Sequence, residues 1–173
     1  SVASRGLGDV YKRQGFSEQT WQELSELGLM ALAVDEAHGG MGMGAVEAMV
    51  VMEQLGQGLV MDAVVQSWLV AQVLLSHGQP SLQTQHLPAL ASGQWRCALA
   101  HQERAARYRL GVCDATAQET APGVWSISGL KSLVPMAPHA HAFLVTAKIK
   151  GQMAMFLVDA QTTGVKVRAY AGQ

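Results

Sequence analysis

The chain has 173 residues, of which 49% are apolar and 14% are charged, and its formal net charge is −1. This apolar content supports a folded core. Balanced charge without a cluster of cations disfavours nucleic-acid binding. Four polar residues interrupt the most apolar stretch, residues 59–75, so we expect no membrane span: Asp62, Gln66, Ser67 and Gln72. The two cysteines lack the spacing of a metal site or of a disulfide framework, which favours the reducing cytoplasm.

The two ends of the chain differ from the rest in their patterning. Residues 1–14 (SVASRGLGDVYKRQ) have neither helical nor strand periodicity, and we expect a non-native or disordered leader there. Residues 164–170 (GVKVRAY) alternate in the way a strand does. Because the sequence stops soon afterwards and would leave the edge of that strand unpaired, we interpret the chain as a fragment.

Helical signals fill residues 15–93. Ser17 is suited to cap a helix with a narrow apolar stripe, and Gly28 is a stop signal for that helix. Residues 45–55 are apolar on nearly all sides, a pattern typical of a buried helix. Two further helices are expected, over residues 62–78 and over residues 81–88, where the second meets Pro88.

The pattern changes after Gly93 to short β-like runs separated by glycine and proline. These runs cover residues 95–99, 111–120, 124–128, 142–148, 154–158 and 165–170. Helices followed by strands predict an α+β protein. We expect an all-α helical N-terminal domain at residues 15–93, followed at residues 94–173 by an antiparallel, β-barrel-like middle domain that is incomplete.

A glycine-rich segment at residues 38–44 (HGGMGMG) raises the question of nucleotide binding. Its G-x-G-x-G spacing lacks the third glycine of the dinucleotide fingerprint, and no Gly-Lys-Ser/Thr follows it. Residues 29–34 would have to form the preceding strand, yet the chain stays helical after the loop. The segment therefore favours a connection between helices, with glycine supplying positive φ, over a phosphate-binding loop.

Other catalytic patterns are weak. His139 and His141 would share one face of an extended segment, but no third ligand has a matching spacing, so we expect no metal site. No G-x-S-x-G elbow supports hydrolase chemistry. Two segments with polar tips, residues 98–103 and 129–137, read on their own as ordinary strand ends.

The order of the motifs resembles the acyl-CoA dehydrogenase family. Residues 21–28 (WQELSELG) and 34–42 (VDEAHGGMG) are similar to its W-x-x-L-x-x-L-G and P-E-x-x-G-G-x-G signatures. Residues 53–56 (EQLG), 87–93 (LPALASG) and 125–131 (WSISGLK) resemble its E-E-L-G, L-P-x-L-x-S-G and W-x-L-x-G-x-K motifs. The resemblance runs from about Gly15 to Tyr170.

This resemblance implies a helical domain, a β-barrel-like domain and a C-terminal four-helix bundle, of which the first two are represented here. It implies α,β-desaturation of an acyl-CoA substrate, in which a proton leaves the α-carbon and a hydride leaves the β-carbon. No side chain accepts a hydride, so the resemblance implies FAD as the cofactor. The thioester carbonyl also needs hydrogen bonds to stabilise the charge that develops.

In the family, an L-T-E-P turn and a W-I-T segment hold the flavin. The positions of this chain that match Leu-Thr-Glu and Trp-Ile-Thr are Leu99, Ala100, His101 and Leu133, Val134, Pro135. The hydroxyls are lost at Ala100 and Pro135, and proline also lacks an N–H. These departures resemble the branch that contains the small subunit of pimeloyl-CoA dehydrogenase. We expect the two segments to meet at neighbouring strand ends.

The resemblance also implies that the catalytic carboxylate belongs to the C-terminal domain, so no catalytic residue is expected here. Glu103 and Glu119 are expected in turns or strand ends, with nothing marking either as buried. An electron-transfer partner for the reduced flavin and a homo- or hetero-oligomer are implied as well. The alternative hypothesis is a non-catalytic structural subunit that pairs with an active homologue.

Overall fold

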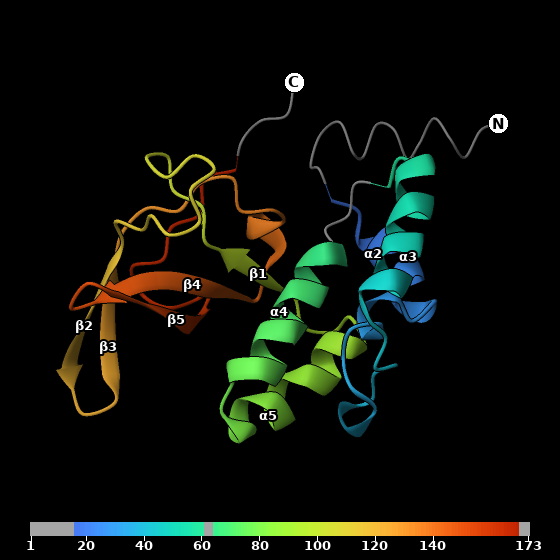
Figure 1. Cartoon of the computed structure of the whole chain (residues 1–173), viewed down its shortest axis with the longest axis horizontal. Helices are drawn as coiled ribbons and strands as arrows, with labels where there is room; N and C mark the ends of the chain where they lie inside the picture. The colour runs from blue at the N-terminus through green and yellow to red at the C-terminus, as the bar shows by residue number, and fades with distance from the viewer. Residues whose placement is uncertain (1–15, 61–63, 170–173) are drawn as a thin grey trace.

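The computed structural model describes residues 16–60 and 64–169, and in these ranges helices precede strands (Figure 1). The α-helices are α2 (Glu18–Glu26), α3 (Ala45–Gln57), α4 (Val64–His77) and α5 (Pro80–Ala91). The strands are β1 (Cys97–Ala100), β2 (Thr116–Ala121), β3 (Val124–Ser128), β4 (Ala142–Ile149) and β5 (Gln152–Asp159). The α+β class is confirmed. The expected leader, the first residues of the third expected helix and Tyr170 lie outside the described residues.

Local signals set the first helix. The Ser17 side chain accepts a hydrogen bond from the N–H of Thr20 at 3.2 Å, which confirms the cap. Gly28 follows the helix in the left-handed region at φ 78°, as the stop signal predicts. Trp21 is buried and donates its indole N–H to the carbonyl of Gly93 at 2.9 Å, so the first helix is fixed to the end of the helical half.

The glycine-rich segment connects short 3-10 turns to α3 and follows no strand. Residues 29–31 form a 3-10 turn, and Gly39 and Gly42 have positive φ, so the predicted connection between helices is confirmed. Gly40 is required for another reason. A Cβ added there would lie 2.0 Å from the carbonyl oxygen of buried Val34.

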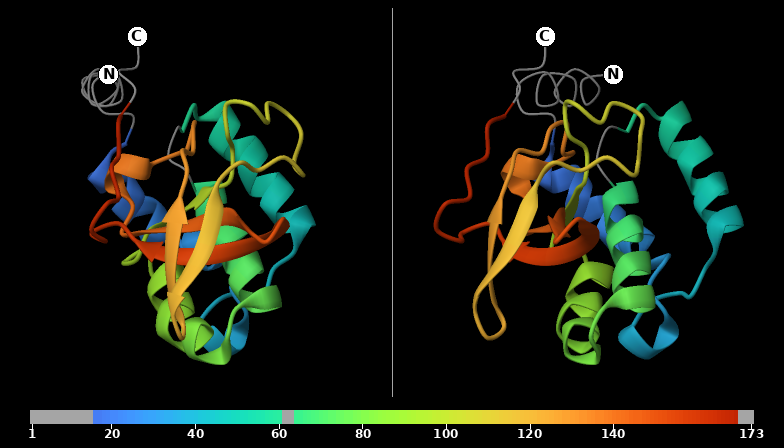
Figure 2. Two further views of the ribbon diagram at one scale, coloured as in Figure 1. Left: turned by 90° about the vertical axis from the view of Figure 1, so that its left-hand side faces the viewer. Right: turned by 60° about the vertical axis from the view of Figure 1, so that its left-hand side comes forward.

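The prediction that residues 45–55 form a buried helix is wrong about burial. Helix α3 lies on the outside of the helical half, and its apolar residues on one side contact the core through Leu55 (Figure 2). Val51 also packs on the core, but four other large apolar side chains of α3 are 41–66% exposed: Val46, Met49, Val50 and Met52. The sequence pattern shows that this helix is apolar all round, but among the described residues only one side of it is covered.

Helix α5 runs through Pro88 to Ala91, three residues further than expected. Trp68 of α4 is largely buried and donates its indole N–H to the carbonyl of Leu29 at 2.6 Å, which joins α4 to the turn after α2. Among the helices of residues 16–60 and 64–169, none has the length and apolar character needed to cross a membrane.

The sheet is mixed and open, where an antiparallel, barrel-like and incomplete sheet was expected. Strand β4 pairs parallel with β1 on one edge and antiparallel with β5 on the other, while β2 and β3 form an antiparallel hairpin. A parallel pair is possible because the long connection between β1 and β4 returns the chain to the same end of the sheet. Residues 165–169, expected in a last strand, form none.

Helices and sheet share one hydrophobic core. Cys97, Ala142 and Leu144 from β1 and β4 pack in the same buried cluster as Trp21 and the apolar residues of α4 and α5. Helix α4 lies against β1, and the Gln66 side chain accepts a hydrogen bond from the N–H of Leu99 at 2.9 Å. An ion pair between Arg96 and Glu18, at 2.7 Å, adds a contact at the start of β1.

Gly40→Ala is expected to lower the free energy of unfolding by about 3 kcal/mol, because the new methyl group meets the Val34 carbonyl. Gly56→Ala is the matched control. No heavy atom lies within 4 Å of a Cβ at Gly56, and in the last turn of α3 this change should stabilise the chain by up to ~1 kcal/mol. Urea unfolding followed by tryptophan fluorescence measures both. Equal effects of the two substitutions would contradict the packing described.

Candidate functional site

The structure brings together the two segments that the sequence singled out. The N–H of Ser132 donates to the carbonyl of Gln102 at 2.8 Å, directly after β1. Ala100 and Val134 pack in one small apolar cluster with Phe143. The expected juxtaposition is therefore present. Contrary to expectation, residues 133–135 lie in a loop and not at a strand end.

The six positions differ in what they expose. Leu133 has a positive φ of 53° and is exposed, and Pro135 is also exposed. Val134 and His101 are half-buried, and Ala100 is buried. The Leu99 N–H is already bonded to Gln66, so this position offers no free donor.

Glu103 is buried, with an exposed fraction of 4%. Nothing in the sequence indicated this burial, so the expectation for Glu103 is corrected. Glu103 is the most deeply buried charged residue among residues 16–60 and 64–169. Its carboxylate accepts hydrogen bonds from the backbone N–H groups of Asp114 and Ala115 and from the Cys113 thiol. Glu119, by contrast, is exposed on the β2–β3 hairpin.

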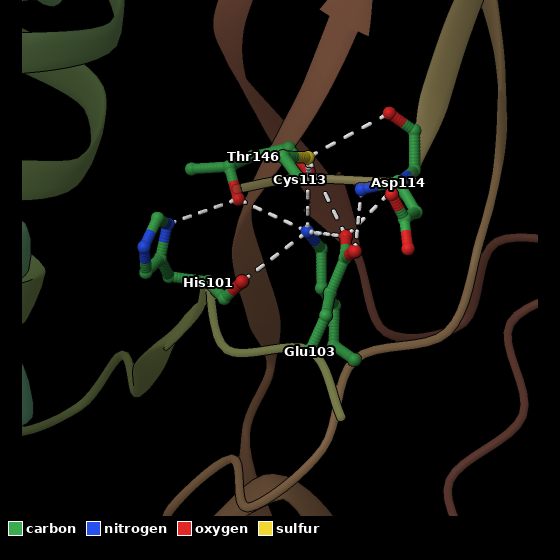
Figure 3. Close-up of polar contacts among 7 residues, drawn as sticks. His101, Glu103, Cys113, Asp114 and Thr146 are labelled. Carbon is green, nitrogen blue, oxygen red and sulfur yellow. Dashed lines mark hydrogen bonds and ion pairs between the residues drawn. The ribbon is translucent and has the colours of Figure 1, made fainter. Parts of the chain in front are cut away.

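Lys131 neutralises this carboxylate. Its Nζ lies 2.6 Å from Glu103 Oε1, 3.0 Å from Thr146 Oγ1 and 3.3 Å from the carbonyl oxygen of His101. Figure 3 shows these contacts meeting between the loop after β1, the segment before β2 and strand β4. Both partners of the ion pair are more than nine-tenths buried. The pair therefore joins residues 98–103 to residues 129–137.

The surroundings of Glu103 lower the pKa of its carboxyl group. Burial by itself raises the pKa of the carboxyl group, because it disfavours the charged form. Hydrogen bonds from Lys131, from the backbone of Asp114 and Ala115 and from Cys113 outweigh burial and lower the pKa to about 2. Glu103 is thus a stable anion that is a poor proton acceptor at neutral pH.

His101 is held from one side. Its Nδ1 lies 3.2 Å from the hydroxyl of Thr146, a fully buried residue of β4. Its Nε2 has no hydrogen-bond partner among the described residues, and Figure 3 shows that side of the ring pointing away from the cluster.

Neither the paired histidines nor the cysteines form a further site. His139 stacks on Phe16, and His141 Nδ1 accepts the N–H of Arg96. In residues 16–60 and 64–169, no group of three or more His, Cys, Asp or Glu side chains is placed to hold a metal ion. Burial raises the pKa of the Cys97 thiol to about 12, so this thiol is unreactive at neutral pH.

Sequence reasoning missed Thr146 and the role of Cys113. A signal for Thr146 existed, since it is the one hydroxyl in the apolar β4 segment (AFLVTAKI). A polar side chain inside a buried strand needs a hydrogen-bonding partner. For Cys113 no signal was present in the sequence, because its partner Glu103 lies ten residues earlier and meets it only through the folding of the intervening loop.

Two families of known domains match the chain. The acyl-CoA dehydrogenase N-terminal domain matches residues 5–94, and the acyl-CoA dehydrogenase middle domain matches residues 98–173. The chain therefore belongs to the acyl-CoA dehydrogenase family, a family of FAD-dependent proteins.

Individual relatives agree with this assignment. Acyl-CoA dehydrogenase FadE27 of Mycobacterium tuberculosis is 31% identical over 159 residues, which cover 91% of this chain and 41% of that protein. The crystal structure of the ChsE4-ChsE5 complex from Mycobacterium tuberculosis matches with a TM-score of 0.80 at 30% identity, over 91% of this chain and 42% of the other. A structure described as PigA with FAD and proline shares the fold, with a TM-score of 0.79 at 24% identity, over 90% and 42%. The chain spans about two fifths of the length of the curated relatives it matches.

Glu103→Gln is expected to lower the free energy of unfolding at pH 7 by about 3 kcal/mol, since the Lys131 ammonium would stay buried without its anion. The wild-type advantage is pH-dependent. The pKa of Glu103 falls from 4.5 to about 2 on folding, so this stabilisation is complete above about pH 4.5 and is lost as the pH falls towards 2.

Urea titrations of both proteins between pH 7 and pH 3 measure this difference. Glu119→Gln, at an exposed carboxylate, is the control and should change stability by no more than ~0.5 kcal/mol throughout. A gap between wild type and Glu103→Gln that keeps its size down to pH 3 would show that the anion is not what stabilises the fold.

Proposed function

We propose that the chain is the front part of an FAD-dependent acyl-CoA dehydrogenase. Residues 15–93 would be its helical N-terminal domain and residues 94–173 its middle domain. The observation that carries the proposal is the meeting of residues 99–101 with residues 133–135, joined by the buried pair of Glu103 and Lys131. Family membership supports it independently.

The residues present fit a flavin in two respects. Half-buried Val134 and exposed Leu133 offer a small apolar surface against which an aromatic ring system can pack. His101 Nε2 is a polar atom without a partner in the described chain and can donate to a ligand oxygen. When bound, the flavin would supply the hydride acceptor that desaturation of an acyl thioester requires.

The chain's own residues would bind and orient this group. The Ser132–Gln102 backbone hydrogen bond sets the spacing of the two segments, and Lys131 fixes the carbonyl of His101. No carboxylate among the described residues is suited to remove the α-proton. Glu103 is occupied by Lys131 and three further donors, and its pKa of about 2 makes it a weak base.

An acyl-CoA substrate, an electron-transfer partner for the reduced flavin and a homo- or hetero-oligomer belong to the same proposal. A cytoplasmic location is supported by Cys97 and Cys113, both of which are free and buried.

The second candidate function is a non-catalytic subunit that pairs with an active homologue. Two observations favour it: a relative at 30% identity is a ChsE4-ChsE5 complex, and the family's Thr-Glu and Trp-Ile-Thr side chains are replaced here. A full-length protein that purifies yellow supports the first candidate. A colourless protein that acquires flavin only with a partner subunit supports the second.

Leu133→Asp is expected to weaken FAD binding by about tenfold, or ~1.4 kcal/mol, through loss of apolar contact and repulsion of the pyrophosphate. Aspartate tolerates the positive φ of this position, so folding should be unaffected. Leu130→Asp is the matched control, because Leu130 is also exposed but lies outside residues 99–101 and 133–135. Quenching of flavin fluorescence on titration with protein measures both. Equal affinities would remove residues 133–135 from the site.

We also expect no dehydrogenase turnover from the 173-residue chain supplied with FAD and an acyl-CoA, because its buried carboxylate is committed to Lys131. Reduction of an artificial electron acceptor is the measurement, with FAD alone as the background. Turnover above that background, abolished by Glu103→Gln and kept in Glu119→Gln, would place the base within this chain.

A further inference from the structure

A continuous line of polar contacts runs from the buried carboxylate to the half-buried imidazole. Glu103 Oε1 contacts Lys131 Nζ at 2.6 Å, Lys131 Nζ contacts Thr146 Oγ1 at 3.0 Å, and Thr146 Oγ1 contacts His101 Nδ1 at 3.2 Å. Figure 3 draws this line of contacts. The side chains of Glu103, Lys131 and Thr146 are all buried. Water therefore does not compete for their protons.

The donors and acceptors along this line determine which group donates in each hydrogen bond. The Lys131 ammonium has three protons to donate and no lone pair to accept with. It faces oxygens of Glu103, Thr146 and the His101 backbone, and also the Cys113 sulfur at 3.6 Å. The Thr146 hydroxyl therefore accepts from Lys131 and keeps one proton to give. A fully buried hydroxyl proton without an acceptor is costly. Among the described residues its one available acceptor is His101 Nδ1.

We propose that Glu103, Lys131 and Thr146 are positioning residues that fix the tautomer of His101, leaving the proton of the neutral imidazole on Nε2. Thr146 donates to Nδ1, so Nδ1 is the unprotonated nitrogen. The N–H then lies on the side of the ring that faces away from the cluster, where Nε2 has no protein partner in the described chain. Glu103 takes part by holding the Lys131 ammonium in place beside the Thr146 hydroxyl.

This arrangement gives His101 a defined chemical role. An N–H at Nε2 recognises a carbonyl or anionic oxygen, and it is held in place before the ligand arrives. The ligand part of the inference rests on the proposed function, in which that oxygen belongs to the bound flavin. The tautomer part rests on the protein's own contacts and holds whether or not FAD binds.

The tautomer is tested by long-range ¹H–¹⁵N spectra of the imidazole rings in the 173-residue chain. His101→Gln identifies the His101 signals among the six histidines. We expect the Nε2–H pattern in wild type and in Thr146→Ser, which keeps the hydroxyl. Thr146→Val, which removes it, should move the pattern towards Nδ1–H or a mixture. Thr20→Val is the matched control. The Thr20 hydroxyl lies in helix α2, is buried, and has no hydrogen-bond partner among the described residues.

FAD titration of the same variants tests the role of the donor. Thr146→Val should weaken FAD binding by about fivefold, the worth of roughly one hydrogen bond, while Thr146→Ser and Thr20→Val match wild type. An Nδ1–H pattern in wild type, or a pattern unchanged in Thr146→Val, overturns the tautomer assignment. Unchanged FAD affinity in a Thr146→Val protein with a changed pattern overturns the role of Nε2–H. A wild-type chain that binds no FAD counts against the proposed function, and the spectra still decide the tautomer.

Discussion

The pairing of Glu103 with Lys131 is the interaction on which the rest of the candidate site depends. Removing two charges from water costs several kcal/mol for each ion, and attraction between them compensates only when their remaining hydrogen-bonding capacity is also satisfied. Here the carboxylate also accepts two backbone N–H groups and a thiol, and the ammonium also reaches a hydroxyl and a carbonyl. A pair so fully coordinated allows little movement of the three segments that meet around it.

The helical half supports this arrangement from the other side of the core. Helix α4 lies against β1, and its Gln66 bonds the backbone one residue before the buried Ala100. Trp21 and Arg96 connect the first helix to the segment that enters the sheet. The position of His101 therefore depends on contacts from both halves of the chain, although every residue that bonds it directly lies in the second half.

Elements with local causes were predictable from the sequence. The Ser17 cap, the Gly28 stop and the boundaries of β3 follow from signals within a few residues, and all are present in the structure. Features that depend on distant partners were not predictable. The burial of Glu103 requires Lys131, 28 residues away, and the parallel pairing of β1 requires a strand that follows a long connection. Apolar patterning predicted helix α3 but could not show which of its sides is covered.

The contact between Gln66 and Leu99 lies at the outer edge of strand β1, where the sheet ends. Strand β1 has an apolar sequence (CALA), lies at the end of the strand order and pairs on one side only. An uncovered edge of this kind invites strand addition from another molecule. Helix α4 covers that edge, so the helical half protects the sheet from edge-to-edge aggregation. A sheet domain produced without its helices would expose the backbone of β1 and should be prone to polymerise through it.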